Sequence, residues 1–556
     1  MMKLQKQKKC VGEIGRILFG IVFVSVIFTI YVGHMKYYRP AQMALAFAAF
    51  LGAGLVVWGI LHILPDGGKR VLSLQAAGDF LDRNFSAKEQ KFQFWIILLL
   101  AFAPTYLAYF PGNLAYDSPA QLAIFFGELP MSSSNPLAHT YLLGSFVALG
   151  ERLFQSANIG VAAFTLMQVL LTTNVLARTL VFFRERRVPF SVTIMSLLWC
   201  IFSPTLHLLT VSCAKDILTG VFLVHFILNL IQAAEAGMEG KRERLVYMDL
   251  AVAGILLCLM RNAGIFLVIA VLVTLLLTSP TEQWKALAAL GCVLVVVTVY
   301  SVICKNVLKI PTGEVRENFS VPIQQMAMVY RDKGLGLNVE MTGEQMEAME
   351  EIIPLAGLTN MVENDSADIA KSLFQEEVFV KDPGKYISLY FALGKQNPEI
   401  YKDAFRFLTL PYWDMNENVY KPLSVMNSFS YMTHVDAPVQ SLFPAYHDYL
   451  EEWIWGQDAY PVYISQPGIG IWIVVLVCGM AIIRKKKVMF LGALPIVVYF
   501  VGILFGPVAL LRYLYPIMVA TPALICMVFW DGEPARVEEP EKEEDGAEEI
   551  ENLSEA

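Results

Sequence analysis

The chain has 556 residues, of which 56% are hydrophobic and 17% are charged, and its mean hydropathy is +0.52. This composition excludes an ordinary soluble enzyme, because apolar stretches of about 20 residues recur along the chain and no single soluble core could bury them all. The formal net charge of −8 comes largely from the acidic C-terminal tail, which we expect to be solvated and disordered. The sequence therefore predicts an all-α polytopic membrane protein.

About twelve apolar stretches are expected to cross the membrane. The first follows a basic N-terminal segment and resembles a signal peptide, but it lacks a small-residue cleavage site, so we interpret it as a retained helix. The expected spans are 17–33, 41–64, 94–110, 159–183, 190–211, 217–234, 246–260, 263–278, 286–304, 467–483, 488–507 and 510–530.

A further apolar stretch, 137–154, decides the predicted topology. If it crossed the membrane, three basic clusters would lie outside, whereas short cytoplasmic loops normally carry the excess of Lys and Arg. We therefore expect an amphipathic helix along the outer surface, with His139 and Glu151 at the interface. Both termini then lie in the cytoplasm of a multi-pass protein of the cell membrane. The basic clusters are 184–187, 241–244 and 484–487.

Five parts make up the expected organisation. The third is an outer segment whose apolar residues recur at helical spacing, which predicts a mostly helical extracytoplasmic domain. Thr342 and Gln345 of this domain are expected to form a capping box. The parts are an N-terminal stub with two spans (1–93), a transmembrane core (94–304) with an outer loop (111–158), the extracytoplasmic domain (305–466), the C-terminal spans (467–530) and the acidic tail (531–556).

The predicted topology places five charged residues from four separate loops on the outer face. Each alone could be a helix-end charge that reaches toward the lipid headgroups. Together, three cations and two carboxylates on one leaflet are suited to bind a phosphate and to position an acceptor nucleophile. The five residues are Asp117, Lys215, Asp216, Arg261 and Arg512.

Several short motifs resemble those of GT-C membrane glycosyltransferases of the protein mannosyltransferase and aminoarabinose transferase type. The outer loop entered by "YFPGNLAYDSPAQL" and left through "NPLAHTYLLGSFVALGERLF" resembles the first outer loop of these enzymes. The turns "CAKDIL" and "LMRNAGIFL" are similar to outer-face turns of that superfamily. The phrases "ENFSVPIQQMAMVY" and "LLRYLYPIMVATPAL" resemble uncharacterised bacterial membrane proteins grouped with it, and the resemblance covers residues 94–530.

The resemblance implies a GT-C-like core and a transferase that moves a sugar from a polyprenyl-phosphate donor to an extracytoplasmic glycan, lipid or protein acceptor in bacterial cell-envelope synthesis. Lys215, Arg261 and Arg512 would stabilise the phosphate where charge develops. Asp117 would orient or deprotonate the acceptor hydroxyl. Asp216 would either assist Asp117 or only pair with Lys215.

Two further residues are candidate substrate-binding groups, His139 and Gln121, although His139 could instead be an interfacial side chain. Where the family has a His-Pro-Pro sequence, this chain has Asn135-Pro136 and a displaced His139. It also lacks the second acid of the family's acid pair beside Asp117. The resemblance allows a divalent metal, but the residues of this chain define no ligand set for one.

A transporter or flippase of lipid-linked saccharides is the alternative function, because twelve spans with both ends inside is also a common transporter layout. A structural or assembly protein is a third. Three features weigh against transport: the halves show no repeat, few charged residues lie in the middle of spans, and the outer segment is long. The chain has no nucleotide-binding motif, and no nucleic-acid partner is expected.

Overall fold

The computed structural model describes residues 75–238, 244–311, 313–358, 366–413, 433–455 and 468–532. Within these ranges the regular secondary structure is helical, apart from two isolated β-bridges. The predicted all-α class is therefore confirmed for the described residues. The first two expected spans, 17–33 and 41–64, and most of the acidic tail lie outside them.

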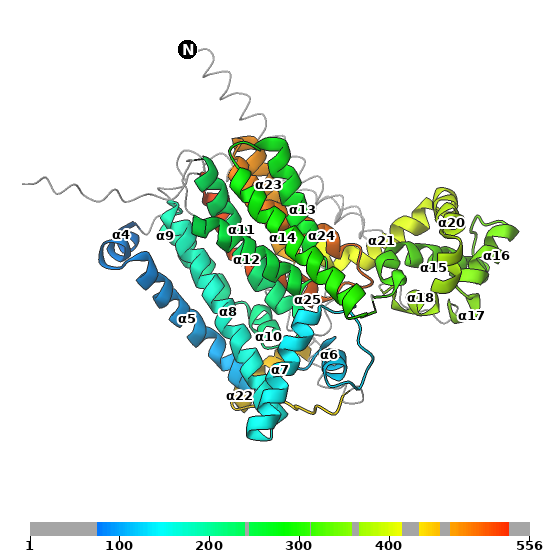
Figure 1. The fold of residues 1–556 in the computed structure, drawn as a ribbon, viewed down its shortest axis with the longest axis horizontal. Helices are drawn as coiled ribbons and strands as arrows, with labels where there is room; N and C mark the ends of the chain where they lie inside the picture. Colours follow the sequence, from blue (N-terminus) through cyan, green and yellow to red (C-terminus); the bar gives the residue numbers. More distant parts are fainter. Residues whose placement is uncertain are drawn as a thin grey trace, which may run out of the picture.

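Helices cover the other ten expected spans and pack into one elongated bundle (Figure 1). A short helix, α4 (Gln75–Asn84), precedes the bundle. The bundle helices are α5 (Ala87–Ala108), α8 (Ala157–Glu185), α9 (Phe190–Ile201), α10 (Pro204–Thr210), α11 (Lys215–Met238), α12 (Arg244–Met260), α13 (Gly264–Thr278), α14 (Trp284–Val302), α23 (Gly468–Arg484), α24 (Lys487–Ile503) and α25 (Leu511–Phe529).

Five helices in the described part of the chain are long and apolar enough to cross a membrane: α5, α8, α11, α14 with its extension to Val307, and α25. A sixth candidate is the pair α9 and α10, which bends by 59°. The bend falls at Pro204, whose ring cannot continue the preceding helix. The length and apolar composition of these helices fit a membrane protein. The number of twelve spans stays a prediction.

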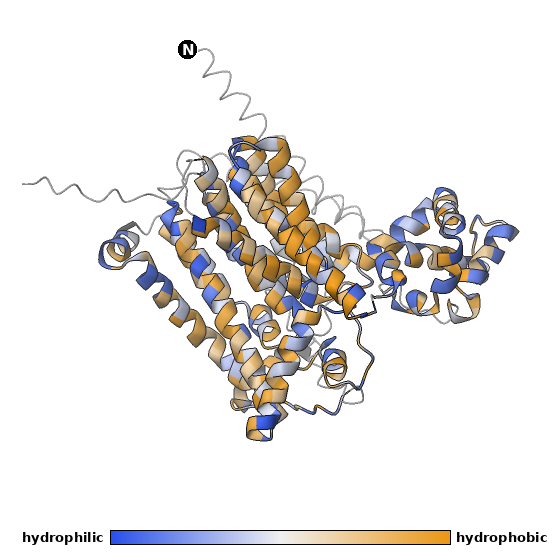
Figure 2. Cartoon of the chain, viewed as in Figure 1, coloured by the Kyte–Doolittle hydropathy of each residue, from blue (hydrophilic) through white to orange (hydrophobic). Residues whose placement is uncertain are grey.

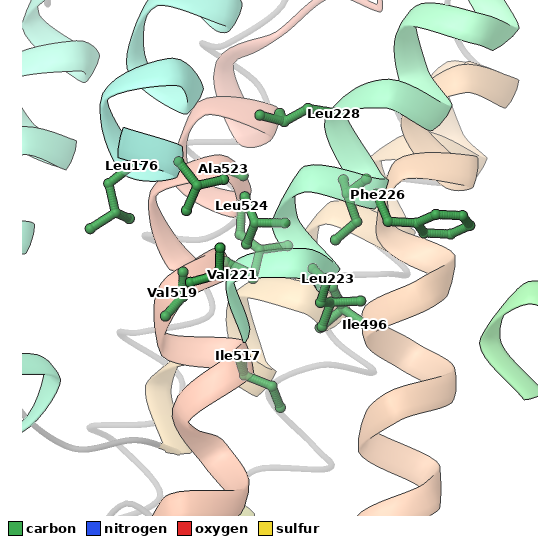
Figure 3. Close-up of a cluster of buried hydrophobic side chains, with 14 of the residues drawn as sticks. Leu176, Val221, Leu223, Phe226, Leu228, Ile496, Ile517, Val519, Ala523 and Leu524 are labelled. Atoms are coloured by element: carbon green, nitrogen blue, oxygen red, sulfur yellow. The ribbon is translucent and has the colours of Figure 1, made fainter. Parts of the chain in front are cut away.

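The core of the bundle is built around α11, most of whose side chains are buried. Figure 3 shows Val221, Leu223, Phe226 and Leu228 of this helix among apolar side chains of α8, α24 and α25. The side chains of Leu223, Phe226 and Leu228 are fully buried. Because this core also includes fully buried Ile217, the first turn of α11 has a fixed position.

A second group of helices projects from one side of the bundle (Figure 1). Its ribbon carries more hydrophilic residues than that of the bundle (Figure 2). Thr342 and Gln345 form the expected capping box. A separate core includes the buried side chains of Val329, Met349 and Leu393. The helices are η2 (Val315–Phe319), α15 (Ser320–Gly334), α16 (Gly343–Ile352), α17 (Leu355–Leu358), α18 (Asp368–Leu373), α19 (Glu376–Lys381), α20 (Pro383–Gln396) and α21 (Pro398–Trp413).

The loop between α5 and α8 carries two helices, α6 (Ser118–Phe125) and α7 (Leu137–Phe154), which lie at the same end of the bundle as α22 (Pro444–Trp455) in Figure 1. Helix α7 is not among the described helices that are long and apolar enough to cross a membrane. It packs closely on α8, because a Cβ atom on Gly150 would lie 2.4 Å from the backbone of Gly160. Its position along the outer surface stays a prediction.

Candidate functional site

Backbone hydrogen bonds join the loop before α6 to the loop before α11. The N–H of Asn113 donates to the carbonyl of Val211 at 2.9 Å, and the N–H of Cys213 donates back to Asn113 at 2.9 Å. Gly112 makes this approach possible: its φ is +126°, and a Cβ atom there would lie 2.4 Å from Thr165 Cγ2. The bridge brings the segment with Asp117 beside the segment with Lys215 and Asp216.

The carboxylate of Asp117 lies between two cations. Lys215 Nζ is 2.9 Å from Oδ2 of Asp117, and Arg512 Nη1 donates to the same oxygen at 3.0 Å. Arg512 Nη2 lies 3.4 Å from Oδ1, so the guanidinium faces both carboxylate oxygens. Asp117 occupies the N-cap position of α6, but its side chain makes no capping hydrogen bond. Its position is therefore not explained by helix capping.

The second carboxylate, Asp216, is fully buried in the first turn of α11. Arg261, from the turn between α12 and α13, donates to its Oδ1 at 2.8 Å. Arg512 Nε lies 3.9 Å from its Oδ2, and among the described residues neither atom has a hydrogen-bond partner. Of the two roles left open for Asp216, pairing with Lys215 is not found among the described residues, because Lys215 contacts Asp117 and donates to Asn135 Oδ1 at 2.5 Å. The other role, assistance to Asp117, stays a prediction.

The structure thus gathers all five charged residues of the sequence prediction into one site, which we call the charged cluster: Asp117, Lys215, Asp216, Arg261 and Arg512. Three cations and two carboxylates leave a net charge of +1. Helices α6, α11, α13 and α25 all begin beside the cluster, and helix N-termini favour anions. Asp117 is the most exposed of the five side chains, at 32%, so ligands would approach the cluster from its side.

Tyrosine rings cover both guanidinium groups. Arg512 lies 4.5 Å from the ring centre of Tyr116 and 4.8 Å from that of Tyr513, and Arg261 lies 4.8 Å from that of Tyr499. Cation–π contacts of this kind hold an arginine fork in place without neutralising its charge. Tyr116 has a φ of +60°, which costs about 1–2 kcal/mol for a residue with a side chain. Such strain is typical of functional sites.

Burial alone would raise the pKa of the Asp117 carboxyl, but the neighbouring charges of Lys215 and Arg512 hold it well below its usual range. The group is therefore ionised at neutral pH. A carboxylate with so low a pKa is a poor proton acceptor, since a general base works best when its pKa is near the working pH. In this state Asp117 is better suited to orient an acceptor than to deprotonate it.

The cluster does not fit a divalent metal. Among the described residues no three His, Cys, Asp or Glu side chains converge as a metal site would require. Each carboxylate of the cluster already contacts at least one cationic side chain, and an excess of positive charge repels a metal ion. The donor set suits an anion, such as a phosphate, whose oxygens accept hydrogen bonds from Arg and Lys.

His139 and Gln121 lie together, but not where an interfacial side chain would be. Both are fully buried, and Gln121 Oε1 lies 3.2 Å from His139 Nδ1. The expectation that His139 sits at the membrane interface is therefore wrong: α7 turns this residue toward α6 and Phe164. Burial and the nearby charge of Lys215 lower the pKa of His139 to about 3, so the ring is neutral. In the described structure its Nε2 has no hydrogen-bond partner.

The projecting helical group holds the segment that leads into Arg512. The N–H of Ala367 donates to the carbonyl of Pro507 at 2.7 Å, and Ser366 forms a β-bridge with Val508. The hydroxyl of Tyr412, in α21, donates to the carbonyl of Val508 at 3.1 Å. The position of Arg512 at the start of α25 therefore depends on this group as well as on the bundle.

Residues 127–544 match a protein family described as a family of unknown function (DUF6020). The chain belongs to this family. The matched region contains Lys215, Asp216, Arg261 and Arg512, whereas Asp117 precedes it. No curated protein matches the chain. No solved structure matches it either.

Sequence reasoning missed four residues of the charged cluster's surroundings: Asn135, Tyr116, Tyr499 and Tyr513. Two of them had a local signal, because Tyr116 directly precedes Asp117 and Tyr513 directly follows Arg512. Asn135 was noted only as a departure from the family's His-Pro-Pro sequence, and Tyr499, far along the chain from Arg261, had no signal.

Proposed function

We propose that this DUF6020 member is an integral-membrane glycosyltransferase with a GT-C-like core, which moves a sugar from a polyprenyl-phosphate donor to an extracytoplasmic acceptor in cell-envelope synthesis. The observation that supports it is the charged cluster. Charged side chains from four separate segments converge at the end of an apolar bundle and leave a net positive charge. Burying charged side chains in a membrane protein costs free energy, so residues of this kind usually serve a function.

In the proposed reaction the acceptor oxygen attacks the anomeric carbon of the donor sugar. The bond from that carbon to the phosphate oxygen breaks, and the lipid phosphate leaves with the electron pair. Lys215 and Arg512 stabilise the charge that develops on the phosphate, with Arg261 holding Asp216 in place. The acceptor proton passes to a carboxylate or to solvent.

Asp117 occupies the phosphate position before the donor arrives, because it already contacts Lys215 and Arg512. A phosphate oxygen would compete for the same donors and release the carboxylate. Once released, Asp117 loses the two charges that depress its pKa and regains basicity toward the acceptor hydroxyl. Binding of the donor would thus free Asp117 to act on the acceptor hydroxyl.

The proposal includes twelve spans with both termini in the cytoplasm and the charged cluster outside. In a variant without native cysteines, a cysteine at Ser134, just before α7, and one at Arg152, in the last turn of α7, should both react with an impermeant thiol reagent from outside. A cysteine at Glu185, at the far end of α8, should react only after the membrane is permeabilised. Labelling of the two cysteines from opposite sides would show that α7 crosses the membrane. The predicted side of every later loop would then be reversed.

The transfer reaction is tested with purified protein in lipid vesicles that contain a polyprenyl-phosphate sugar, by measuring release of polyprenyl phosphate. Arg512→Ala should reduce donor affinity strongly, and Arg512→Lys should restore it only in part, because Lys lacks the planar fork that faces both oxygens of Asp117. Glu151→Gln, on α7 and outside the charged cluster, is the matched control. Full donor affinity in Arg512→Ala would remove this residue from the site.

A flippase of lipid-linked saccharides is the second candidate, and one observation favours it. Arg178 of α8 and His225 of α11 are hydrogen bonded to each other inside two of the candidate spans. Ionisable groups at such positions often mark transport pathways. In sealed vesicles a flippase would move the donor between leaflets without an acceptor, whereas a transferase would release polyprenyl phosphate only when an acceptor is present.

A further inference from the structure

Two cationic side chains and a histidine lie together in the bundle, away from the charged cluster. They are Lys91 of α5, Arg178 of α8 and His225 of α11, and we call this group the inner cationic site. Arg178 Nη1 lies 2.7 Å from His225 Nδ1. Lys91 is close enough for its charge to act on both Arg178 and His225. All three side chains are partly exposed.

The position of this site follows from the helix geometry. Lys91 is four residues from the start of α5, and Arg178 is seven residues from the end of α8. At 1.5 Å per residue, both lie within about 6–11 Å of the same end of the bundle. This is the end opposite the charged cluster, and the proposed topology places it at the cytoplasmic face.

Arg178 differs from the other arginines near the end of α8. Arg184 forms an ion pair with Asp82, and Arg186 forms one with buried Glu235. Arg178, the farthest of the three from the end of α8, has no carboxylate within ion-pair distance among the described residues. Its direct partners are the uncharged side chains of His225 and Asn229, with Nη2 of Arg178 2.5 Å from Asn229 Oδ1.

Two carboxylates lie near Arg178 without contacting it. Asp249 and Glu185 are close enough for their charges to attract it, and both are exposed. Water or headgroups therefore screen them, whereas Arg178 and its partner Asn229 are more deeply placed. A cation held by neutral partners inside an apolar bundle is costly, and an anion that reaches it would lower that cost.

The surroundings indicate what kind of anion. Phe92 on α5 and Met248 and Val252 on α12 are exposed apolar side chains on the helices that flank the inner cationic site. Exposed apolar groups at this depth are suited to contact acyl chains rather than water. Basic pockets between membrane helices on the cytoplasmic side are known to hold lipid headgroups.

We infer that Lys91, Arg178 and His225 form a binding site for the phosphate of an anionic phospholipid in the leaflet opposite the charged cluster. Arg178 and Lys91 contact the phosphate oxygens, and His225, whose Nδ1 faces Arg178, fixes the guanidinium. The acyl chains lie along the exposed apolar side chains of α5 and α12. This inference does not depend on the transferase activity.

The test uses the full-length protein purified in neutral detergent and titrated with phosphatidylglycerol, with bound lipid counted by native mass spectrometry. Lys91→Gln and Arg178→Gln should each weaken binding by about tenfold. Arg184→Gln, on the same helix but paired with Asp82, should change it less than twofold. If Arg178→Gln does not fold, Lys91→Gln carries the test, because this side chain is partly exposed near the start of α5.

Three results would overturn the inference. Unchanged affinity in folded Lys91→Gln and Arg178→Gln, or equal losses in Arg184→Gln, would show that the lipid does not bind this site. Displacement of the lipid by millimolar inorganic phosphate would indicate a site for a soluble anion. In an Arg512→Ala background, displacement by an equimolar amount of polyprenyl phosphate would assign the site to a substrate lipid instead of a membrane phospholipid.

Discussion

Replacing Asp117 with Asn should separate catalysis from donor binding. The amide keeps the shape of the side chain but removes the charge that orients the acceptor, so sugar transfer should fall by about 10²–10⁴-fold, or roughly 3–5 kcal/mol of barrier. Donor affinity should instead rise, because Lys215 and Arg512 lose the carboxylate that competes with the phosphate. For a partly exposed pair we expect a gain of about fivefold, or ~1 kcal/mol.

Both quantities are measured on the same purified variant, with polyprenyl-phosphate binding determined separately from turnover. Glu151→Gln controls for loss of a carboxylate outside the charged cluster. An Asn variant that keeps more than about a third of the wild-type rate would leave Asp117 less than ~1 kcal/mol to supply, and Asp216 would become the catalytic candidate. Weaker phosphate binding in this variant would contradict the idea that Asp117 occupies the phosphate position.

Replacing Arg261 with Met should strongly destabilise the protein. Asp216 is fully buried, and among the described residues Arg261 is the only cationic side chain that donates a hydrogen bond to it, at 2.8 Å. The nearest atom of Arg512 is 3.9 Å away. Removing one partner of a buried pair leaves an uncompensated charge, which costs up to about 3–5 kcal/mol. The double variant Asp216→Asn and Arg261→Met removes both charges and should recover most of that stability.

The measurement is the apparent free energy of unfolding in mixed micelles, together with the melting temperature. Lys402→Met is the control, since its ion pair with Glu399 is exposed to solvent and should contribute little to stability. Wild-type stability in the single Arg261 variant would mean that Asp216 finds another partner or is uncharged. A double variant no more stable than the single one would show that the loss does not come from the charge.

Hydrophobic length was sufficient to place the helices of the bundle. Each expected span within the described residues coincides with helix, since runs of apolar residues long enough for a bilayer have few other stable forms. The break between α9 and α10 was not predicted, because 190–211 was expected as one span, although Pro204 lies at the break. The number of crossings was not decided by the same signal, because α13, α23 and α24 are apolar but short.

The charged cluster was predicted from a shared face, and this was enough to identify its members but not their pairing. Side-chain contacts depend on helix rotation and on the loop bridge between Asn113 and Ser212, neither of which has a sequence pattern. For the same reason His139 was placed at the interface and Arg178 was overlooked. An isolated charge in an apolar stretch shows that something must compensate it, but only the fold shows which residue does.

The most direct test of the proposed function compares the lipid-linked sugars of cells that lack the protein with those of cells that carry wild type or Asp117→Asn. If the protein is a transferase that works at the outer surface, a polyprenyl-phosphate sugar should accumulate in the outer leaflet, where periodate added to intact cells can oxidise it. The Asn variant should accumulate the same lipid. Accumulation of that lipid only where periodate cannot reach it, or no change in any lipid-linked sugar, would contradict a transferase at the outer face.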